Sequence, residues 1–301
     1  MKKIRYLAEY LFLVLFGKIV RLLPRKVMLS IGARAGDFIY YCAPVRKKLT
    51  LEQIRRAFPE KNSREISAIA REAYGNLAIN SLEHLCLPAL TKDDLLNIVT
   101  FKNEEVFQNA LQKGRGVIFV GGHFGNWEYP GPAASAKGYP IAYVVADIGN
   151  PYIDKMVNRH RKQTGITVLT KRMSIRTMLK TLRQNNAMAM LMDQDAGRNG
   201  IFVDFFGMPC STPRGPALFA LKTGAIILFV SSIRHPDGSL QVIFEEVETD
   251  CDAGITSENI REVTQRCTSK LEAYVRKYPG QWFWMHRRWK TAPEDSSEKQ
   301  E

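Results

Sequence analysis

A histidine and a glutamate five positions apart are the residues whose types and spacing best suit catalysis. His123 and Glu128 lie in the segment His-Phe-Gly-Asn-Trp-Glu, directly after an apolar run at 117–120 and two glycines. Imidazole titrates near neutral pH, and a carboxylate can fix its tautomer and stabilise its charged form. We therefore expect His123 to take a proton from a substrate hydroxyl while Glu128 orients the imidazole.

The local pattern predicts how this pair is positioned. A short apolar run that ends in glycine is typical of a buried strand entering a tight turn. Asn126 is then a predicted N-cap, with a helix from Trp127. Residues five apart on a regular helix point about 140° from each other. The pair can meet only if His123 lies on the turn and Glu128 in the first helical turn. Pairs with this spacing also arise by chance on surfaces and in caps.

Two arginines form a candidate anion site. Arg159 and Arg161 lie near the end of a helix predicted at 150–163. A guanidinium can hold a phosphate or a carboxylate through two parallel hydrogen bonds. The alternative is that these cations complement the negative end of the helix dipole.

Two acids follow another predicted strand. Asp193 and Asp195 come directly after the apolar run at 187–192. This spacing fits a metal ligand or a second catalytic carboxylate. No further cluster of His, Asp or Glu has ligand spacing, so we expect no metal. Gly121, Gly122 and Gly125 do not form the dinucleotide pattern G-x-G-x-x-G, and no G-x-S-x-G nucleophile motif is present.

Charge and cysteine content restrict the partners and the compartment. The formal net charge is +13, of which +10 falls in residues 1–65, and residues 159–183 hold eight basic residues and no acid. Such patches attract nucleic acid, anionic lipid headgroups or acidic proteins. The five cysteines are odd in number and lack a C-x-x-C pair, which favours a reducing compartment over a disulfide framework.

The first 24 residues are predicted to attach the protein to a membrane. Residues 4–23 are apolar but interrupted by charges, and the uncharged core at 10–17 is far shorter than the roughly 20 residues of a simple span. The flanking cations fit an interfacial helix whose lysines and arginines reach the headgroups. A buried core helix is the alternative, and a span stays open.

The remaining pattern predicts an α/β fold with a largely parallel, mixed sheet flanked by helices. Apolar runs at 116–120, 141–145, 166–169, 187–192 and 225–233 alternate with helical segments at 128–137, 150–163, 173–185 and 214–222. A turn at 235–238 and an alternating run at 240–247 predict an antiparallel hairpin. We divide the chain into an anchoring helix (1–24), a helical region (25–100), an α/β core (101–292) and a disordered tail (293–301).

Aromatic residues in the last third allow several interpretations. Trp282, Trp284 and Trp289 alternate with basic residues, which suits a nucleic-acid stacking platform, a membrane-interface belt or packing on the core. The loop at 205–207 suits a core plug or the wall of an acyl-chain site, and the core plug is the default.

Several blocks, in this order, resemble one family. They are GGHFGNWE at 121–128, DQD at 193–195, FFGMP at 205–209, TPRG at 212–215, KTGA at 222–225 and QWFWMHRRWK at 281–290. Together they resemble the bacterial lipid A late acyltransferases, the lauroyl and myristoyl transferases within the histidine-x4-acid acyltransferases. The N-terminal part matches least, with only Arg46 and AFPE at 57–60.

The resemblance implies acyl transfer from the thioester of acyl carrier protein to a hydroxyl of a lipid A precursor. It implies the cytoplasmic face of the bacterial inner membrane, no cofactor and no nucleic-acid partner. His123 and Glu128 are then catalytic. Arg161, with Arg159 as alternative, Gly122 and Asn126 are then substrate-binding, and Asp193 belongs to a block that is structural or binds the acceptor. Backbone N–H groups at 121–125 are expected to stabilise the oxyanion. The alternatives are an acyltransferase for another glycolipid or a lysophospholipid, and a degenerate basic membrane-binding protein.

Overall fold

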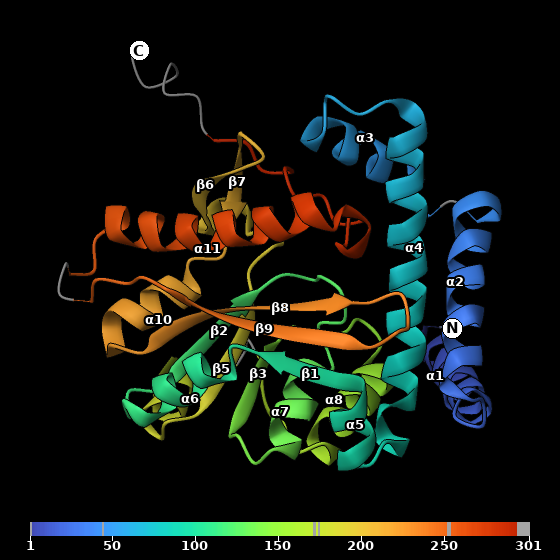
Figure 1. Ribbon diagram of the computed structural model, residues 1–301, viewed down its shortest axis with the longest axis horizontal. Helices are drawn as coiled ribbons and strands as arrows, with labels where there is room; N and C mark the ends of the chain where they lie inside the picture. Colours follow the sequence, from blue (N-terminus) through green and yellow to red (C-terminus); the bar gives the residue numbers. More distant parts are fainter. Residues whose placement is uncertain (1, 44, 171–172, 174, 252–253, 294–301) are drawn as a thin grey trace.

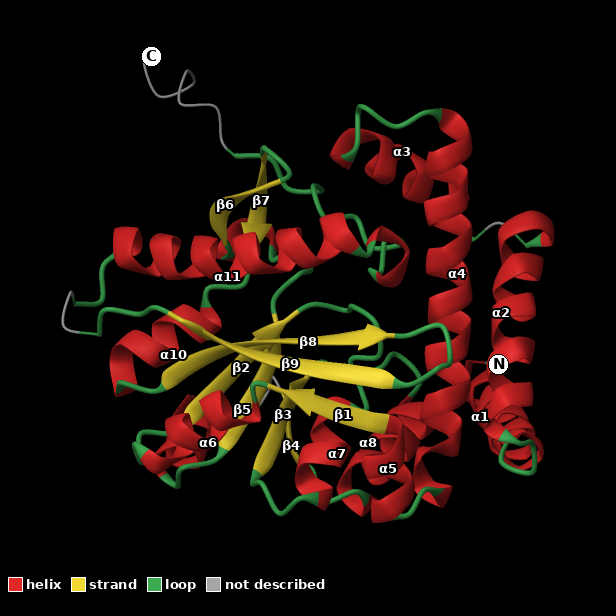
Figure 2. Ribbon diagram, viewed as in Figure 1, coloured by secondary structure: helices red, strands yellow, loops and turns green. Residues whose placement is uncertain are grey.

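A seven-stranded sheet forms the centre of the molecule and confirms the predicted α/β class (Figure 2). The computed structural model describes residues 2–293 except 44, 171–172, 174 and 252–253. The strands are β1 (Val99–Lys102), β2 (Val117–Gly121), β3 (Ile141–Val145), β4 (Thr167–Thr170), β5 (Ala187–Leu191), β8 (Ile226–Arg234) and β9 (Leu240–Val247). Their order in the sheet is β1-β9-β8-β2-β5-β3-β4.

The sheet is parallel except where β9 pairs with β8 in the predicted hairpin. Every residue of β2 is buried, because helices cover both faces of the sheet there. Since β2, β5 and β8 run in the same direction, their carboxyl ends meet at one edge. Ligands of open α/β sheets bind outside this edge.

Two apolar layers cover the sheet. On one face pack α5 (Lys92–Ile98), α6 (Glu104–Gln112) and α7 (Pro130–Ala136), and on the other α9 (Ile175–Arg183), α10 (Gly215–Thr223) and α11 (Ser257–Lys277). The helix α8 (Pro151–Gln163) packs beside β4. Thr256 caps α11, whereas α7 begins at Pro130, three residues later than the helix start predicted at Trp127.

The first helices of the described chain are α1 (Lys2–Val20), α2 (Arg25–Cys42), α3 (Lys47–Ala57) and α4 (Ser63–Cys86). In Figure 1, α4 stands across the edge at which β8 ends, and α2 lies on its outer side. The N-cap of α4 is Asn62, which forms a capping box with Glu65.

Large apolar side chains of α1 are exposed, Phe12 by 66% and Leu15 by 62%. Within the described part of the chain, none of the helices combines the length and hydropathy that crossing a membrane requires.

The aromatic residues near the C-terminus pack in the core. Trp282 and Trp284 are almost completely buried, which excludes the stacking platform and the membrane belt for this pair. A hairpin of β6 (Ile201–Phe205) and β7 (Met208–Thr212), which the sequence did not predict, carries the loop at 205–207. Phe205 is fully buried against Trp282, as expected of a core plug. The strand β1 was also not predicted, and the tail from residue 294 on lies outside the described residues.

Candidate active site

His123 lies on the turn that follows β2, and its partner is Asp193, which follows β5. The Nδ1 atom of His123 lies 2.8 Å from Oδ1 of Asp193. The backbone N–H of His123 donates to Oδ2 of the same carboxylate at 2.7 Å, and the indole N–H of Trp282 donates to it at 2.9 Å. Because β2 and β5 are parallel neighbours, both residues leave the sheet at the same edge.

Glu128 binds a guanidinium. Arg161 of α8 donates from Nε to Oε2 of Glu128 at 3.1 Å and from Nη2 to Oε1 at 2.5 Å. Such a bidentate pair is the strong form of an ion pair. His84 of α4 lies nearby, with Nδ1 3.9 Å from Oε2 of Glu128. Arg159 is exposed on α8, so the structure brings Arg161, and not Arg159, to the motif.

The residue that orients His123 therefore differs from the expected one. Spacing along the chain placed Glu128 near His123, but Asp193 makes the hydrogen bond at Nδ1. The physical reason is that the parallel neighbours β2 and β5 bring Asp193 next to His123, while the Glu128 side chain points to Arg161 of α8. Asp193 is buried by these contacts, with 2% of its side chain exposed, so in this structure its carboxylate binds protein groups and is not presented to a substrate.

For each of the two carboxylates, burial raises the pKa and the neighbouring charges and hydrogen bonds lower it. Burial alone would raise the pKa of Asp193, but the His123 imidazole and the hydrogen bonds from His123 and Trp282 lower that pKa to about 2. Burial would likewise raise the pKa of Glu128, and the Arg161 guanidinium outweighs it, so the pKa lies below its usual value. Both groups are therefore ionised at neutral pH.

Asn126 supports the turn rather than a substrate. It is 1% exposed. Its Oδ1 accepts the backbone N–H groups of Glu128 and Tyr129, both at 2.9 Å, and its Nδ2 donates to Glu83 of α4 at 2.6 Å. These bonds to the next residues explain the cap-like sequence, although the helix begins later. The buried Asn126 amide is used by protein groups in place of the expected substrate contact.

Gly122 allows a close approach of backbone and carboxylate. A Cβ atom at this position would lie 3.0 Å from Oδ2 of Asp193 and 2.9 Å from Cδ1 of Leu271. The absent side chain therefore lets the Asp193 carboxylate reach the backbone N–H of His123. This is a packing reason for the glycine at the position expected to bind substrate.

Three of the N–H groups expected to form an oxyanion hole are used within the protein. The N–H of His123 donates to Asp193, that of Phe124 to Gly122 O at 2.8 Å, and that of Gly125 to Gln281 O at 2.8 Å. The expected oxyanion role is therefore wrong for these three groups in this conformation. They shape the turn instead.

Aromatic rings and an apolar cavity border the histidine. The rings of Trp127 and Phe283 lie 5.2 and 6.1 Å from the His123 ring, centroid to centroid. A cavity of about 410 Å³ opens between α1, α4 and α8, with Trp127, Glu128 and Arg161 in its wall. Its other walls are mostly apolar side chains, which include Leu13, Phe16, Leu85, Ile153 and Val157.

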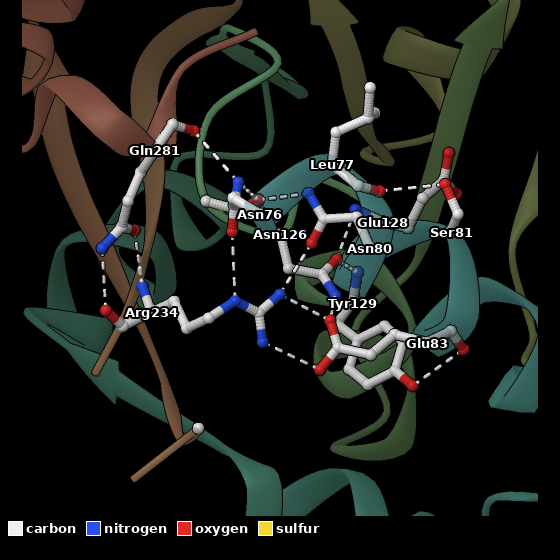
Figure 3. A network of polar contacts seen from close by, with 12 residues as sticks. Asn76, Leu77, Asn80, Ser81, Glu83, Asn126, Glu128, Tyr129, Arg234 and Gln281 are labelled. Carbon is white, nitrogen blue, oxygen red and sulfur yellow. Dashed lines mark hydrogen bonds and ion pairs between the residues drawn. The ribbon is translucent and has the colours of Figure 1, made fainter. Parts of the chain in front are cut away.

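Residues that sequence reasoning missed lie on α4 and at the end of β8. Figure 3 shows Asn76, Asn80 and Glu83 of α4 together with Arg234 and Gln281 around the motif. Glu83 is fully buried and Arg234 nearly so. The available signal was three polar residues at helical spacing in a periodic apolar segment, which indicates a buried polar face.

Comparison with known proteins is consistent with this geometry. The family model of bacterial lipid A biosynthesis acyltransferases matches residues 1–291. The lipid A biosynthesis lauroyltransferase of Escherichia coli (strain K12) is 24% identical over 296 residues, which cover 96% of this chain and 94% of that protein. The lipid A biosynthesis palmitoleoyltransferase of the same organism is 23% identical over 273 residues, which cover 90% and 87%.

A mycobacterial protein is also similar. The phosphatidylinositol mannoside acyltransferase of Mycolicibacterium smegmatis is 26% identical over 185 residues, which cover 60% of this chain and 59% of that protein. The chain thus matches about three fifths of the length of this relative. Since the family model spans nearly the whole chain, including the His123 turn, the protein belongs to the bacterial lipid A biosynthesis acyltransferase family.

Proposed function

We propose that this protein transfers a fatty acyl chain from the thioester of an acyl carrier protein to a hydroxyl of a lipid A precursor. The acceptor is the hydroxyl of an acyl chain already on the precursor, so the product is an acyloxyacyl group. The observation that carries the proposal is the buried Asp193 bound to Nδ1 of His123 in a member of this family.

The hydrogen bond determines which nitrogen acts as the base. A neutral imidazole carries one proton, and Asp193 holds it at Nδ1, so Nε2 carries the lone pair. The acceptor hydroxyl gives its proton to Nε2 as its oxygen attacks the thioester carbonyl. Collapse of the tetrahedral intermediate breaks the carbon–sulfur bond, and the thiolate takes the proton from the imidazolium. The Asp193 carboxylate stabilises the charged His123 between these two steps.

The cavity beside Glu128 suits a hydrocarbon chain. Its volume of about 410 Å³ lies within the roughly 300–1,000 Å³ of small-molecule sites. Its apolar walls favour an alkyl chain, and Trp127 lies both in its wall and against the His123 ring. A chain in this cavity therefore ends close to the base. The long hydrocarbon of a fatty acyl substrate is the ligand class that these walls favour.

We also propose that α1 and α2 attach the protein to an anionic membrane surface. Both helices expose apolar side chains, among them Phe12 and Leu15 of α1 and Ile31 and Phe38 of α2. Residues 1–65 supply a net charge of +10, which complements anionic headgroups. Location at the cytoplasmic face of the inner membrane follows from a membrane-bound acceptor and a carrier-protein donor.

Sedimentation with vesicles tests the membrane proposal. Phe12→Asp combined with Leu15→Asp is expected to reduce the fraction bound to anionic vesicles several-fold, because both side chains leave the apolar surface. The control is Gln112→Asp on the exposed end of α6, which adds a negative charge without removing an apolar side chain. Point variants are preferable to deletion of residues 1–24, because that deletion also removes Leu13 and Phe16 from the cavity wall. Unchanged sedimentation of the double variant would place the membrane contact elsewhere.

The function itself is tested by following thiol release and product mass. Purified protein is mixed with acyl carrier protein thioester and a lipid A precursor, and free thiol and acylated lipid are measured together. We expect both to appear in equal amounts and only with acceptor present. Thiol release at the same rate without acceptor would contradict the proposal. Chelation of divalent metals is expected to leave the rate unchanged, because the proposed steps need only His123 and Asp193.

A second acceptor class has a specific observation behind it. The mycobacterial relative is named for phosphatidylinositol mannosides, and it is similar over 185 residues. A phosphatidylinositol mannoside is therefore the competing acceptor in the same assay. A higher kcat/KM with this acceptor than with the lipid A precursor would make another glycolipid the natural substrate class.

A further inference from the structure

One face of α4 binds the turn that carries the base. Asn76, Asn80 and Glu83 are spaced by four and three residues, so they lie on the same side of the helix. The Nδ2 atoms of Asn76 and Asn80 donate to the carbonyl oxygen of Gly125 at 2.9 and 2.5 Å. Glu83 accepts from Nδ2 of Asn126 at 2.6 Å. Three side chains of one helix thus hold two consecutive residues of the turn.

Arg234, the last residue of β8, contacts all three of these side chains (Figure 3). Its Nε donates to Oδ1 of Asn76 at 3.1 Å, and its Nη2 donates to Oδ1 of Asn80 at 2.7 Å. Two further donors reach the Glu83 carboxylate at 2.9 and 2.6 Å. One guanidinium therefore supplies four hydrogen bonds to a single face of α4.

These bonds decide the orientation of the two amides. The oxygen and nitrogen of an Asn amide are similar in shape, so either can face a neighbour unless the hydrogen-bond partners differ. Arg234 only donates, so it requires the oxygen atoms of Asn76 and Asn80 on its side. The NH₂ groups must then face the acceptor, Gly125 O. Without the guanidinium, a flipped amide would place its oxygen against that carbonyl.

The turn is sensitive to such a change because it is tightly packed. Gly125 has φ +54°, and a Cβ atom there would lie 1.5 Å from the carbonyl oxygen of Ser232. Its N–H is bound to Gln281 O at 2.8 Å. The side chain of Gln281 in turn bonds both backbone groups of Arg234, at 2.9 and 2.8 Å. Arg234 is thus linked to the turn by two sets of hydrogen bonds, one through the side chains of α4 and one through Gln281.

We propose that Arg234 is a positioning residue for the acyl transfer. Through Asn76, Asn80 and Glu83 it holds the turn at Gly125 and Asn126 in the place where the His123 imidazole meets its substrate. This inference rests on the proposed function and adds a residue that acts on the base without touching substrate. A misplacement of about 1 Å in a catalytic group can reduce the rate about 10²-fold.

A matched control separates positioning from stability. Arg25 of α2 donates to the same Glu83 carboxylate at 2.9 Å, but its other bond goes to Gly238 O, away from the turn. Arg25→Met therefore removes a cation from the same buried carboxylate and leaves both Asn amides with Arg234. Arg234→Lys keeps the charge but loses the planar set of donors, which lysine cannot replace.

We expect Arg234→Lys to lower kcat about 10²-fold with KM changed less than about threefold. Arg25→Met is expected to retain kcat within about threefold at an equal or larger fall in melting temperature. If the two variants lose kcat in proportion to melting temperature, the network is structural only and the inference is overturned.

A double variant sharpens the test. Glu83→Leu with Arg234→Met removes both buried charges of the ion pair. Arg25 also loses its carboxylate partner, but its side chain is 28% exposed and can be solvated, so stability can recover. The turn still lacks its partners, so we expect kcat to stay low. Recovery of both stability and kcat would overturn the inference.

A readout without substrate keeps this inference distinct from the proposed acyl transfer. The Nδ1 proton of His123, held by Asp193, is followed by ¹⁵N-edited NMR in the full-length protein. We expect its signal to shift or broaden in Arg234→Lys and to stay unchanged in Arg25→Met. If the wild type fails to acylate a lipid A precursor but this pattern holds, the proposed substrate is wrong and the positioning role stands. An unchanged signal in Arg234→Lys would overturn the role.

Discussion

Asp193 is buried and Glu128 is partly buried beside the same turn, and the two carboxylates are bound by different kinds of donor. Asp193 accepts hydrogen bonds from a backbone N–H, an indole and an imidazole. Glu128 accepts from two donors on one edge of the Arg161 guanidinium, Nε and Nη2. Both carboxylates are ionised, and Glu128 is paired directly with a permanent cation, the Arg161 guanidinium.

This difference in partners indicates different roles for the two carboxylates. The Asp193 charge can stabilise an imidazolium that forms during the reaction, because the carboxylate lies against Nδ1 of His123. The Glu128 charge is already balanced by Arg161, so it contributes less to stabilising the imidazolium when His123 takes a proton. We infer that His123 and Asp193 act in the chemical step, while Glu128 and Arg161 shape the wall of the adjacent cavity.

The largest effect is expected at the base itself. His123→Ala is predicted to reduce kcat about 10⁴-fold, because no other group takes the hydroxyl proton. Circular dichroism should show an intact fold, since the side chain is partly exposed. Activity within a few-fold of the wild type would exclude His123 as the base.

Asp193→Asn is predicted to reduce kcat about 10³-fold. An amide in this place can donate its NH₂ to Nδ1 and so stabilise the wrong tautomer, with the lone pair of Nε2 lost. Steady-state kinetics with the same acceptor measure the effect. Glu128→Gln is the comparison variant, and an equal or larger loss there would reverse the roles we assign to the two carboxylates.

Glu128→Gln is predicted to reduce kcat only about 10-fold and to lower the free energy of unfolding by about 3 kcal/mol. The stability loss arises because Arg161 is left as a partly buried charge without its partner. Urea unfolding measures the stability and the thiol assay the rate.

Arg161→Lys should show a similar but smaller pattern, because lysine cannot bind both carboxylate oxygens in the same plane. Arg159→Lys, on the exposed surface of α8, serves as the control and should change neither the rate nor the unfolding curve. Equal effects at both arginines would favour the helix-end interpretation.

The smallest expected effect is on protein stability at acidic pH, and it concerns His160, which lies beside His84 near Glu128. Burial and the neighbouring His84 lower the pKa of His160 to about 4. The unfolded state therefore binds the proton more readily, and the contribution to stability is lost as pH falls from about 6.5 towards 4. His160→Gln should flatten the fall in melting temperature between pH 7 and 5. Identical slopes in variant and wild type would show that other groups cause the loss.

The Asp193 carboxyl group titrates at a lower pH than His160. The folded pKa of about 2 lies below the usual value, so its stabilising contribution is present above about pH 4 and is lost only as pH falls towards 2. Acidification to pH 5 should therefore destabilise the packing around His160 and His84, while the bond between Asp193 and His123 persists.

Much of the fold follows from local pattern. The runs at 141–145 and 240–247 became β3 and β9 with unchanged bounds, and α8 begins one residue from the predicted start. Parallel strands buried on both faces need continuous apolar runs, which are visible in a sequence. The short β1 and the β6–β7 hairpin were missed because four or five residues with mixed burial carry little periodicity.

The candidate residues and the edge of the sheet at which they lie can be read from the sequence. His123 follows one apolar run and Asp193 another, so both lie at the carboxyl edge of a parallel sheet. Which acid binds the imidazole depends on the three-dimensional arrangement. Asp193 is 70 positions from His123 but adjacent in space, whereas Glu128 turns towards Arg161. The physical reason is that hydrogen-bond partners depend on strand order and helix placement, and spacing along the chain encodes neither.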